Sequence, residues 1–203
     1  MKTRSQVETS IMRIAIFGTG GVGGYFGGRL AQAGEDVTFI ARGEHLHAIQ
    51  TKGLRVDSLN GDFVIYPAKA TDSVAEVGAV DLVIVGVKAW QVPEAACAMK
   101  TLIGPTTTVL PMQNGVDAVP QLTAELGHGV VVGGLCKIVS FVVRPGHIRH
   151  AGVSPSIMIG ELDNRRTDRI LAIEQTFNRA GLETTSAANI GSATPAASWA
   201  DAH

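Results

Sequence analysis

The sequence contains few cysteines, few aromatic residues and almost no net charge. Of its 203 residues two are cysteine and 5% are aromatic, and the formal net charge at pH 7 is -1. Two cysteines far apart in apolar contexts cannot build a disulfide framework, so we expect Cys97 and Cys136 to be reduced, buried small hydrophobes of a cytoplasmic protein. The charge excludes the basic surface expected of a protein that binds nucleic acid or an anionic membrane.

Long apolar runs are also missing. The longest uncharged stretches, such as residues 101–116, contain Pro105, Pro111 and polar residues that a lipid-facing helix would not keep. Residues 1–11 form a polar leader without an apolar signal core, which we expect to be disordered; Met12 is a second possible start. With 45% hydrophobic residues, the chain is long enough for one full domain with a core.

A glycine-rich stretch follows the first apolar run, residues 14–17. Gly18, Gly20 and Gly23 stand in G-x-G-x-x-G spacing and open a helical pattern. In a dinucleotide-binding fold the first glycine makes the tight turn, the second leaves room for the pyrophosphate, and the third lets helix and strand pack closely. The spacing alone also fits a plain glycine-rich turn, but its place between a strand and a helix favours a phosphate site.

The residue at the end of the second predicted strand distinguishes the two nicotinamide cofactors. A site that prefers NAD places Asp or Glu there to bind the ribose 2′-hydroxyl, whereas this chain has Arg42. Glu35 and Asp36 lie at the opposite end of that strand. Because a guanidinium group can hold a phosphate with two hydrogen bonds, we predict NADP(H) as the cofactor. The alternative for Arg42 is an ordinary solvated arginine.

Two more polar residues follow predicted strands. Lys88 ends an apolar run, at the sheet edge where cofactor phosphates and ribose should lie, and we expect it to contact the cofactor. Asn114 follows the next strand, and its amide could bridge cofactor and a carbonyl substrate. Asn114-Gly115 is also a good turn, and the residues alone favour that interpretation.

The order of elements predicts an α/β fold with a Rossmann-like, doubly wound, mostly parallel sheet. Asn60-Gly61 between two strand-like runs predicts a hairpin. Three short runs after residue 137, separated by turn residues, predict antiparallel strands appended to the sheet. The predicted strands cover residues 14–17, 37–40, 80–87, 107–112, 130–135, 138–143, 146–150 and 156–160, and the predicted helices begin near residues 22, 44, 93 and 119.

The last predicted helix begins at Asp163 or Asn164 and ends at Gly181. Its apolar stripe consists of Ile170, Ile173, Phe177 and Ala180. Residues 184–203 are rich in Ala, Ser and Thr and contain no Lys or Arg. We therefore expect one dinucleotide-binding domain over residues 12–185, followed by a tail or the start of a truncated region over 186–203.

His147 and His150 raise the question of a metal site. Their odd separation in a strand places them on opposite faces, and no Cys or acidic cluster accompanies them. No metal is expected.

Several motifs together resemble the ketopantoate reductases (2-dehydropantoate 2-reductases). The resemblance covers roughly residues 12–190, which correspond to the family's N-terminal domain. The glycine motif is generic, whereas the Lys-Ala-Trp-Gln and Asn-Gly motifs together are fairly discriminating. The matching segments are Gly18-Thr19-Gly20-Gly21-Val22-Gly23, Ala41-Arg42, Val87-Lys88-Ala89-Trp90-Gln91, Gln113-Asn114-Gly115 and Pro145-Gly146-x-Ile148-x-His150-x-Gly152.

The family reduces the ketone of 2-dehydropantoate to (R)-pantoate with NADPH, in pantothenate biosynthesis. The resemblance implies that residues 18–23 hold the pyrophosphate and that Arg42 and Lys88 contact the 2′-phosphate side. It also implies that Gln91 lies near the adenosine and that Asn114 orients both nicotinamide and substrate. The cofactor would supply the hydride, and the site would orient the ketone.

The chain departs from the family pattern at its end. In the family a lysine in a W-x-K segment, on an all-helical second domain, donates the proton. Here Trp199 is present, but no lysine follows Lys137. We therefore expect a chain truncated before that second domain, which binds NADPH but turns over 2-dehydropantoate poorly or not at all. Apolar surface left uncovered would favour self-association.

Two alternatives stay open. One is a related NADP-dependent reductase that acts on a different small 2-keto acid. The other is a non-catalytic NADPH-binding module or gene remnant.

Overall fold

A parallel five-stranded sheet organises the part of the chain that this computed structural model describes, residues 11–113, 117–188 and 190. The strands stand in the order β5-β2-β1-β6-β7, and each neighbouring pair is parallel. Because the chain winds outward from β1 in both directions, the predicted Rossmann-like, doubly wound sheet is confirmed. The strands are β1 (Arg13–Phe17), β2 (Asp36–Ile40), β5 (Lys69–Thr71), β6 (Leu82–Val85) and β7 (Thr108–Pro111).

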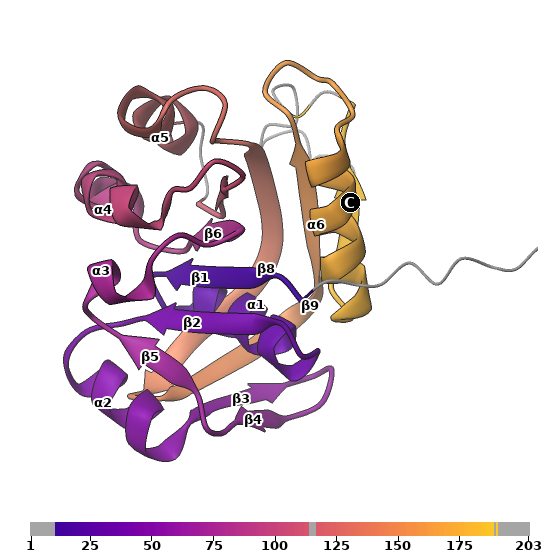
Figure 1. Ribbon diagram of the computed structural model, residues 1–203. Helices are drawn as coiled ribbons and strands as arrows, with labels where there is room; N and C mark the ends of the chain where they lie inside the picture. The colour runs from indigo at the N-terminus through magenta and orange to yellow at the C-terminus, as the bar shows by residue number, and fades with distance from the viewer. Residues whose placement is uncertain (1–10, 114–116, 189, 191–203) are drawn as a thin grey trace, which may run out of the picture.

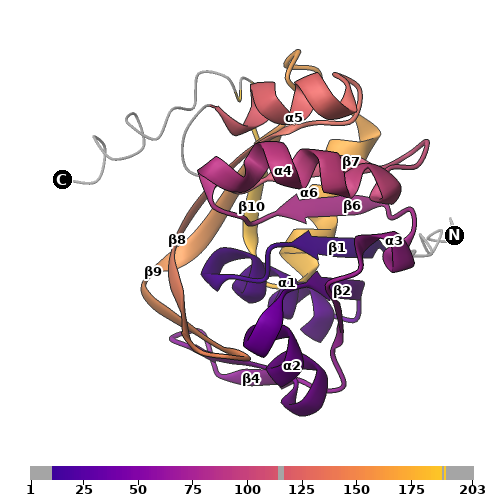
Figure 2. The same ribbon diagram turned by 90° about the vertical axis from the view of Figure 1, so that its left-hand side faces the viewer.

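Helices cover both faces of this sheet (Figure 1). On one face, alternate residues of β1 and β6, such as Phe17 and Val83, form a core with Met99 and Leu122. The other face packs against α1 (Gly21–Gln32). The helices of the first face are α3 (Val74–Val77), α4 (Val92–Ala98) and α5 (Ala118–Leu126), with 3-10 turns η1 (Ala89–Gln91) and η2 (Met99–Leu102) on either side of α4 (Figure 2).

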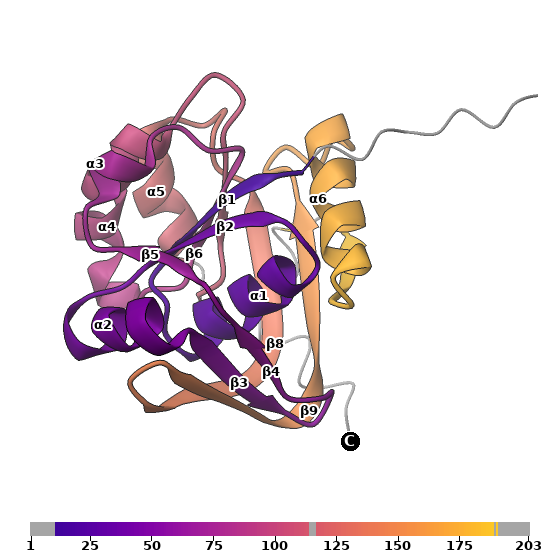
Figure 3. The same ribbon diagram turned by 60° about the horizontal axis from the view of Figure 1, so that its bottom comes forward.

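A second sheet lies on the far side of α1 (Figure 3). Its central strand is β9 (His147–Gly160), and β8 (Gly133–Arg144) runs antiparallel along one side of it. On the other side, β3 (Leu54–Ser58) pairs in parallel with the first part of β9, and β10 (Glu183–Ser186) with the last part. The remaining elements are α2 (Gly43–Lys52), β4 (Phe63–Ile65), which pairs with β3, and α6 (Asp168–Arg179) before β10.

Glycines on α1 bring the two sheets close together. A Cβ atom on Gly27 would lie 2.5 Å from the side chain of Ile16 in β1, and one on Gly24 would lie 2.8 Å from Ile148 in β9. Both distances are shorter than van der Waals contact, so a larger side chain at either position must push a neighbour aside. Helix α1 therefore packs closely against one sheet on each of two sides.

The antiparallel strands differ from the predicted arrangement. Four predicted short strands over residues 130–160 are two long ones, β8 and β9, which bend at register shifts such as the one between Lys137 and Val139. They form the second sheet with β3, β4 and β10, and among the described residues a single isolated bridge, from Val131 to Val109, joins this segment to the parallel sheet. The hairpin at Asn60-Gly61 is confirmed as β3–β4. The turn residues inside β9, Gly152 and Pro155, lie opposite the register shift between Lys137 and Val139 and are not strand ends.

Two further predictions are wrong. The last helix begins at Asp168 and not at Asp163 or Asn164, because Asn164 has a φ of 64° and Asp163 accepts the N–H of Arg165 in a local turn. Cys97 is exposed rather than buried. The apolar stripe of α6 is confirmed, since Ile170, Ile173 and Phe177 are buried.

Within the described residues, no helix combines the length and apolar character needed to cross a membrane.

Candidate functional site

A cleft of about 330 Å³ opens at the carboxyl ends of β1, β2 and β6. This is the point where the strand order reverses, since the chain continues from β1 to β2 on one side and β6 lies on the other. In doubly wound sheets ligands bind at this crevice. The lining comes from the β1–α1 loop, the start of α2, the segment after β6 and α4, and includes Gly18, Gly20, Arg42, His45, Lys88 and Glu94.

The loop after β1 has the shape of a phosphate cradle. Gly18 has a φ of 98°, and a Cβ atom there would lie 2.7 Å from the side chain of Val87. A Cβ atom on Gly23 would lie 2.2 Å from the carbonyl oxygen of Gly18, whereas one on Gly20 would meet nothing within 4 Å. Two of the three glycines are thus required by the fold. The third keeps open the space where a pyrophosphate would lie.

The loop is anchored to β2 through Thr19. The Thr19 hydroxyl donates to the carbonyl oxygen of Ile40 at 3.0 Å, and its backbone N–H donates to the same oxygen at 3.2 Å. Beyond it, α1 begins at Gly21 without a side-chain cap. The first N–H groups of α1 are therefore suited to an anion, with the favourable end of the helix dipole behind them.

The remaining residues of the motif lie beside the cleft rather than in its lining. A Cβ atom on Gly21 would lie 2.3 Å from the carbonyl oxygen of Ser140, so Gly21 packs against β8. Val22 is half-buried and packs against the core between the sheets. Both stand in the first turn of α1.

Arg42 faces an acidic residue at the mouth of the cleft. Its Nη2 atom lies 3.6 Å from Oε1 of Glu94, and both side chains are more than 70% exposed. An ion pair this exposed contributes only about 0–1 kcal/mol. A phosphate dianion could therefore compete with Glu94 for the guanidinium group.

The segment after β6 brings two predicted residues to the same cleft. Lys88 and Gln91 both line it. The Oε1 atom of Gln91 accepts the backbone N–H of Lys88 at 3.1 Å, so this end of the side chain is used locally. Asn114, the predicted orienter of nicotinamide and substrate, lies outside the described residues. Its neighbour Gln113 donates from Nε2 to the carbonyl oxygen of Val87 at 3.2 Å, which ties the end of β7 to the end of β6.

Sequence reasoning missed His45 and Glu94. Burial lowers the pKa of His45, and the backbone of Thr19 opposes that shift. The only sequence signal was the position of His45 three residues after Arg42, one helical turn along α2. Glu94 comes from α4, and its approach to Arg42 depends on how two distant segments pack.

The two histidines of β9 lie on opposite faces, as their spacing predicted. His147 lies 2.8 Å from Oδ2 of Asp57, whereas Nδ1 of His150 lies 2.9 Å from the hydroxyl of Ser58 and its ring packs against Tyr25. Each ring has partners of its own in the second sheet.

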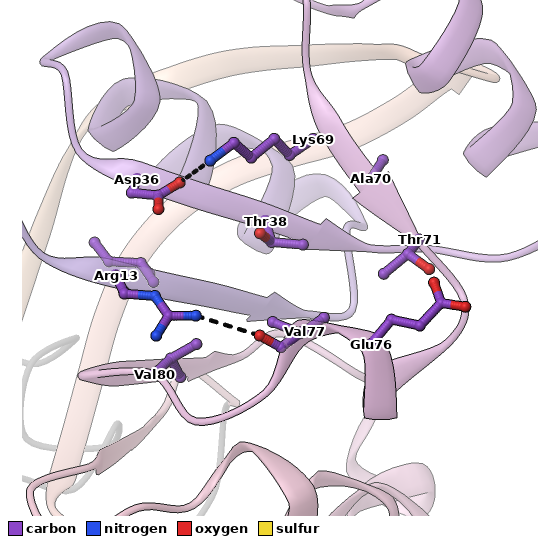
Figure 4. A pocket seen from close by; sticks show the side chains of 10 residues that line it. Arg13, Asp36, Thr38, Lys69, Ala70, Thr71, Glu76, Val77 and Val80 are labelled. Carbon is purple, nitrogen blue, oxygen red and sulfur yellow. Dashed lines mark hydrogen bonds and ion pairs between the residues drawn. The ribbon is translucent and has the colours of Figure 1, made fainter.

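A larger hollow of about 420 Å³ lies at the other end of the parallel sheet (Figure 4). It borders the first residues of β1, β2 and β5, and three of its four charged side chains, those of Arg13, Asp36 and Lys69, have polar partners. Lys69 Nζ lies 2.5 Å from Oδ1 of Asp36, and the guanidinium group of Arg13 donates to the carbonyl oxygen of Val77 at 3.3 Å. The amino ends of parallel strands are the wrong edge for a dinucleotide.

Comparisons with known proteins agree on one family. The family profile described as "Ketopantoate reductase PanE/ApbA" matches residues 14–164. A 2-dehydropantoate 2-reductase of Pyrococcus horikoshii is 35% identical over 179 residues, which are 88% of this chain and 57% of that protein. The chain therefore spans little more than half the length of the curated relatives it matches.

Solved structures show the same likeness. The crystal structure of 2-dehydropantoate 2-reductase from Porphyromonas gingivalis W83 has a TM-score of 0.84 and 32% identity, and the match covers 89% of this chain and 66% of that one. A ternary structure of D-mandelate dehydrogenase with NADH and anilino(oxo)acetate has a TM-score of 0.78 and 25% identity, covering 88% of this chain and 58% of that one.

Proposed function

This chain belongs to the ketopantoate reductase family, and we propose that it binds NADPH in the cleft and serves as the cofactor-binding part of a reductase of small 2-keto acids. The observation that carries the proposal is the open space at Gly20, with Arg42 at the end of β2 and Lys88 at the end of β6 on the same cleft. A glycine loop that could hold a pyrophosphate and two cationic side chains on the same cleft support the proposal.

Different residues would contact different parts of the cofactor. The Gly18–Gly23 loop and the start of α1 would hold the pyrophosphate through backbone N–H groups. Arg42 and Lys88 would neutralise the 2′-phosphate, and Gln91 would lie near the adenosine. Bound NADPH supplies the hydride, while Asn114 would orient the nicotinamide and the substrate ketone.

For the substrate we propose 2-dehydropantoate, reduced to (R)-pantoate, because most of the similar proteins bear that name. A second candidate is another 2-keto acid, favoured by the similarity to D-mandelate dehydrogenase. Activity of the protein in pantothenate biosynthesis is part of this proposal, as is a location in the cytoplasm.

Removal of the Arg42 guanidinium group tests the cofactor assignment. Charge-assisted hydrogen bonds contribute about 1.5–3 kcal/mol, so Arg42→Ala should weaken NADPH binding about 10-fold to 100-fold and leave NADH binding within about twofold. Dissociation constants come from titrations monitored by nicotinamide fluorescence.

Arg165→Ala is the matched control, since Arg165 is also an exposed arginine paired with an acidic residue, Asp163, but lies outside the cleft lining. It should change neither constant. Equal losses of NADPH and NADH on Arg42→Ala would contradict the 2′-phosphate role.

A further inference from the structure

His45 stands on the wall of the cleft and is bonded to a turn about a hundred residues further along the chain. Its Nδ1 atom accepts the backbone N–H of Gly146, between β8 and β9, at 3.1 Å. A ring nitrogen that accepts a hydrogen bond carries no proton, so in the neutral imidazole the proton is on Nε2.

The Nε2 atom of His45 lacks a hydrogen-bond partner in the described part of the chain, although water cannot reach it. Thr19 and His45 both line the cleft, and the backbone of Thr19 opposes the lowering of the His45 pKa by burial. Since Nδ1 is occupied by Gly146, the nitrogen left to face Thr19 is Nε2. A buried donor thus stands beside the phosphate-binding loop without a completed bond, an arrangement that costs free energy until an acceptor moves into range.

The turn at Gly146 is in close contact with β3 and α2. The Gly146 carbonyl oxygen accepts the N–H of Arg55 in β3 at 2.9 Å. Gly146 has a φ of 72°, and a Cβ atom there would lie 3.0 Å from the Cβ of Ala48 in α2. A change in the position of the His45 ring would therefore change the hydrogen bonding of the β8–β9 turn.

We infer that His45 is a positioning residue that couples the phosphate-binding loop to the β8–β9 turn. Its ring holds Gly146 through Nδ1 and presents Nε2–H to the Thr19 carbonyl group, and a dinucleotide seated on the loop completes this second bond. The inference rests on the proposed binding of a nicotinamide dinucleotide in the cleft. Because the pyrophosphate is common to both cofactors, the effect extends to NADH as well as NADPH.

Three substitutions distinguish the roles of the two ring nitrogens of His45. His45→Ala removes both bonds, His45→Asn keeps an acceptor near the Nδ1 position, and His45→Gln keeps a donor near the Nε2 position. We expect Ala and Asn to weaken NADPH and NADH alike, by about threefold to tenfold, and Gln to stay within about twofold. His47→Ala, an exposed histidine of the same helix, is the control.

Amide hydrogen exchange of residues 144–147 gives the second readout, which a merely structural role would not move. In the unsubstituted protein NADPH should slow exchange in this turn. The slowing should disappear in all three His45 variants, including Gln, which keeps affinity but loses the bond to Gly146. Thermal unfolding of each variant checks the fold, and the Asn and Gln pair decides the matter if Ala does not fold.

Three outcomes would overturn the inference: unchanged slowing of the turn in the variants, unchanged affinity in Ala and Asn, or a loss confined to NADPH. The last would make His45 a 2′-phosphate ligand instead. If the unsubstituted protein binds neither dinucleotide, the proposed function itself fails, and this result is distinct from the other three.

Discussion

Glu161 is a buried carboxylate with an extensive set of partners. It is 6% exposed, and its two oxygens accept Nε and Nη2 of Arg169 at 2.6 and 2.5 Å. The hydroxyl of Thr167 also donates to it, and Arg169 reaches on from Nη1 to the carbonyl oxygen of Gly129. The cluster joins the start of α6 to the end of β9 and the loop before β8. The hydrogen bonds from Arg169 lower the pKa of Glu161.

Neutralising this carboxylate should change the acid stability of the protein. Because the pKa of Glu161 is lower in the folded than in the unfolded state, the ionised group stabilises the fold above about pH 4.5, its ordinary pKa. This stabilisation is lost as the pH falls through the folded-state pKa. Glu161→Gln should reduce the free energy of unfolding at pH 7 by about 1.5–3 kcal/mol. The difference from the unsubstituted protein should shrink below pH 4.5.

Urea unfolding at pH 3.5 to 7 measures both effects. Asp163→Asn is the control, since that exposed carboxylate forms an ion pair with the exposed Arg165, and such a pair contributes little to stability. A constant difference across the pH range would show that Glu161 stabilises the fold without its charge.

Single residues were predictable where their role follows from backbone geometry. The glycines of the cradle and Arg42 could be found because spacing and position at a strand end determine where they lie. His45 and Glu94 could not, since their places depend on the rotation of α2 and on the packing of α4 near β2. Asn114 and the assignment of individual cofactor contacts remain predictions.

At the level of elements, α1 has two functions that share its glycines. Its N-cap residue, Gly20, lines the cleft, and its flanks separate the two sheets. On one flank Gly27 lies against Ile16 and Phe39, which are both fully buried. Gly20, at the N-cap, borders open space and has a φ of -80°. Adding a methyl group at these two positions should therefore have opposite effects.

Gly27→Ala should destabilise the fold, and Gly20→Ala should impair binding alone. The first forces a methyl group into packed side chains, at a cost of about 1–3 kcal/mol that the better helix propensity of Ala offsets only in part. The second introduces no strain but fills the cradle, so we expect NADPH to bind at least about 10-fold more weakly. Urea midpoints and NADPH titrations on both variants check this, each variant serving as the control for the other. A native-like urea midpoint for Gly27→Ala would show that the parallel sheet is not closely packed on α1.

Four strands of the parallel sheet, β1, β2, β6 and β7, were predictable because they are apolar runs between helices. The edge strand β5, with the sequence Lys-Ala-Thr, is short and largely polar and was not predicted. The second sheet was not predictable either. Its long strands contain turn residues, such as Gly152 and Pro155, that read locally as breaks. Its pairings join β3 to β9 and β9 to β10, and such distant partners leave no local signal.

At the scale of the whole molecule, the long β8–β9 hairpin carries several exposed apolar side chains, most of them on β8. Val139 and Phe141 are 50% and 47% exposed, and Val143 and Val153 are 43% and 44% exposed. Val139 and Phe141 are two residues apart, so they share a face of the strand. Apolar groups gathered in this way favour association between copies.

Replacing the two β8 residues should therefore reduce self-association. Val139→Thr combined with Phe141→Thr places a β-branched residue with good strand propensity at both positions and reduces the exposed apolar area. Sedimentation velocity over a concentration series should show association of the unsubstituted chain and a shift toward monomer in the double variant. Val64→Thr, an exposed position on β4, should have no effect. A chain that stays monomeric throughout would contradict the prediction.

For the proposed NADPH site, the glycines of the β1–α1 loop and of α1 also determine where substitutions could change cofactor preference. Positions 18, 21, 23, 24 and 27 leave no room for new side chains, because each already touches backbone or core atoms. A directed-evolution library that seeks a switch toward NADH would lose most members randomised there to misfolding. Substitutions of Arg42, Lys88 and Glu94, at the rim of the cleft, change its charge without disturbing either sheet. The positions of the pocket that tolerate substitution are thereby confined to its edge.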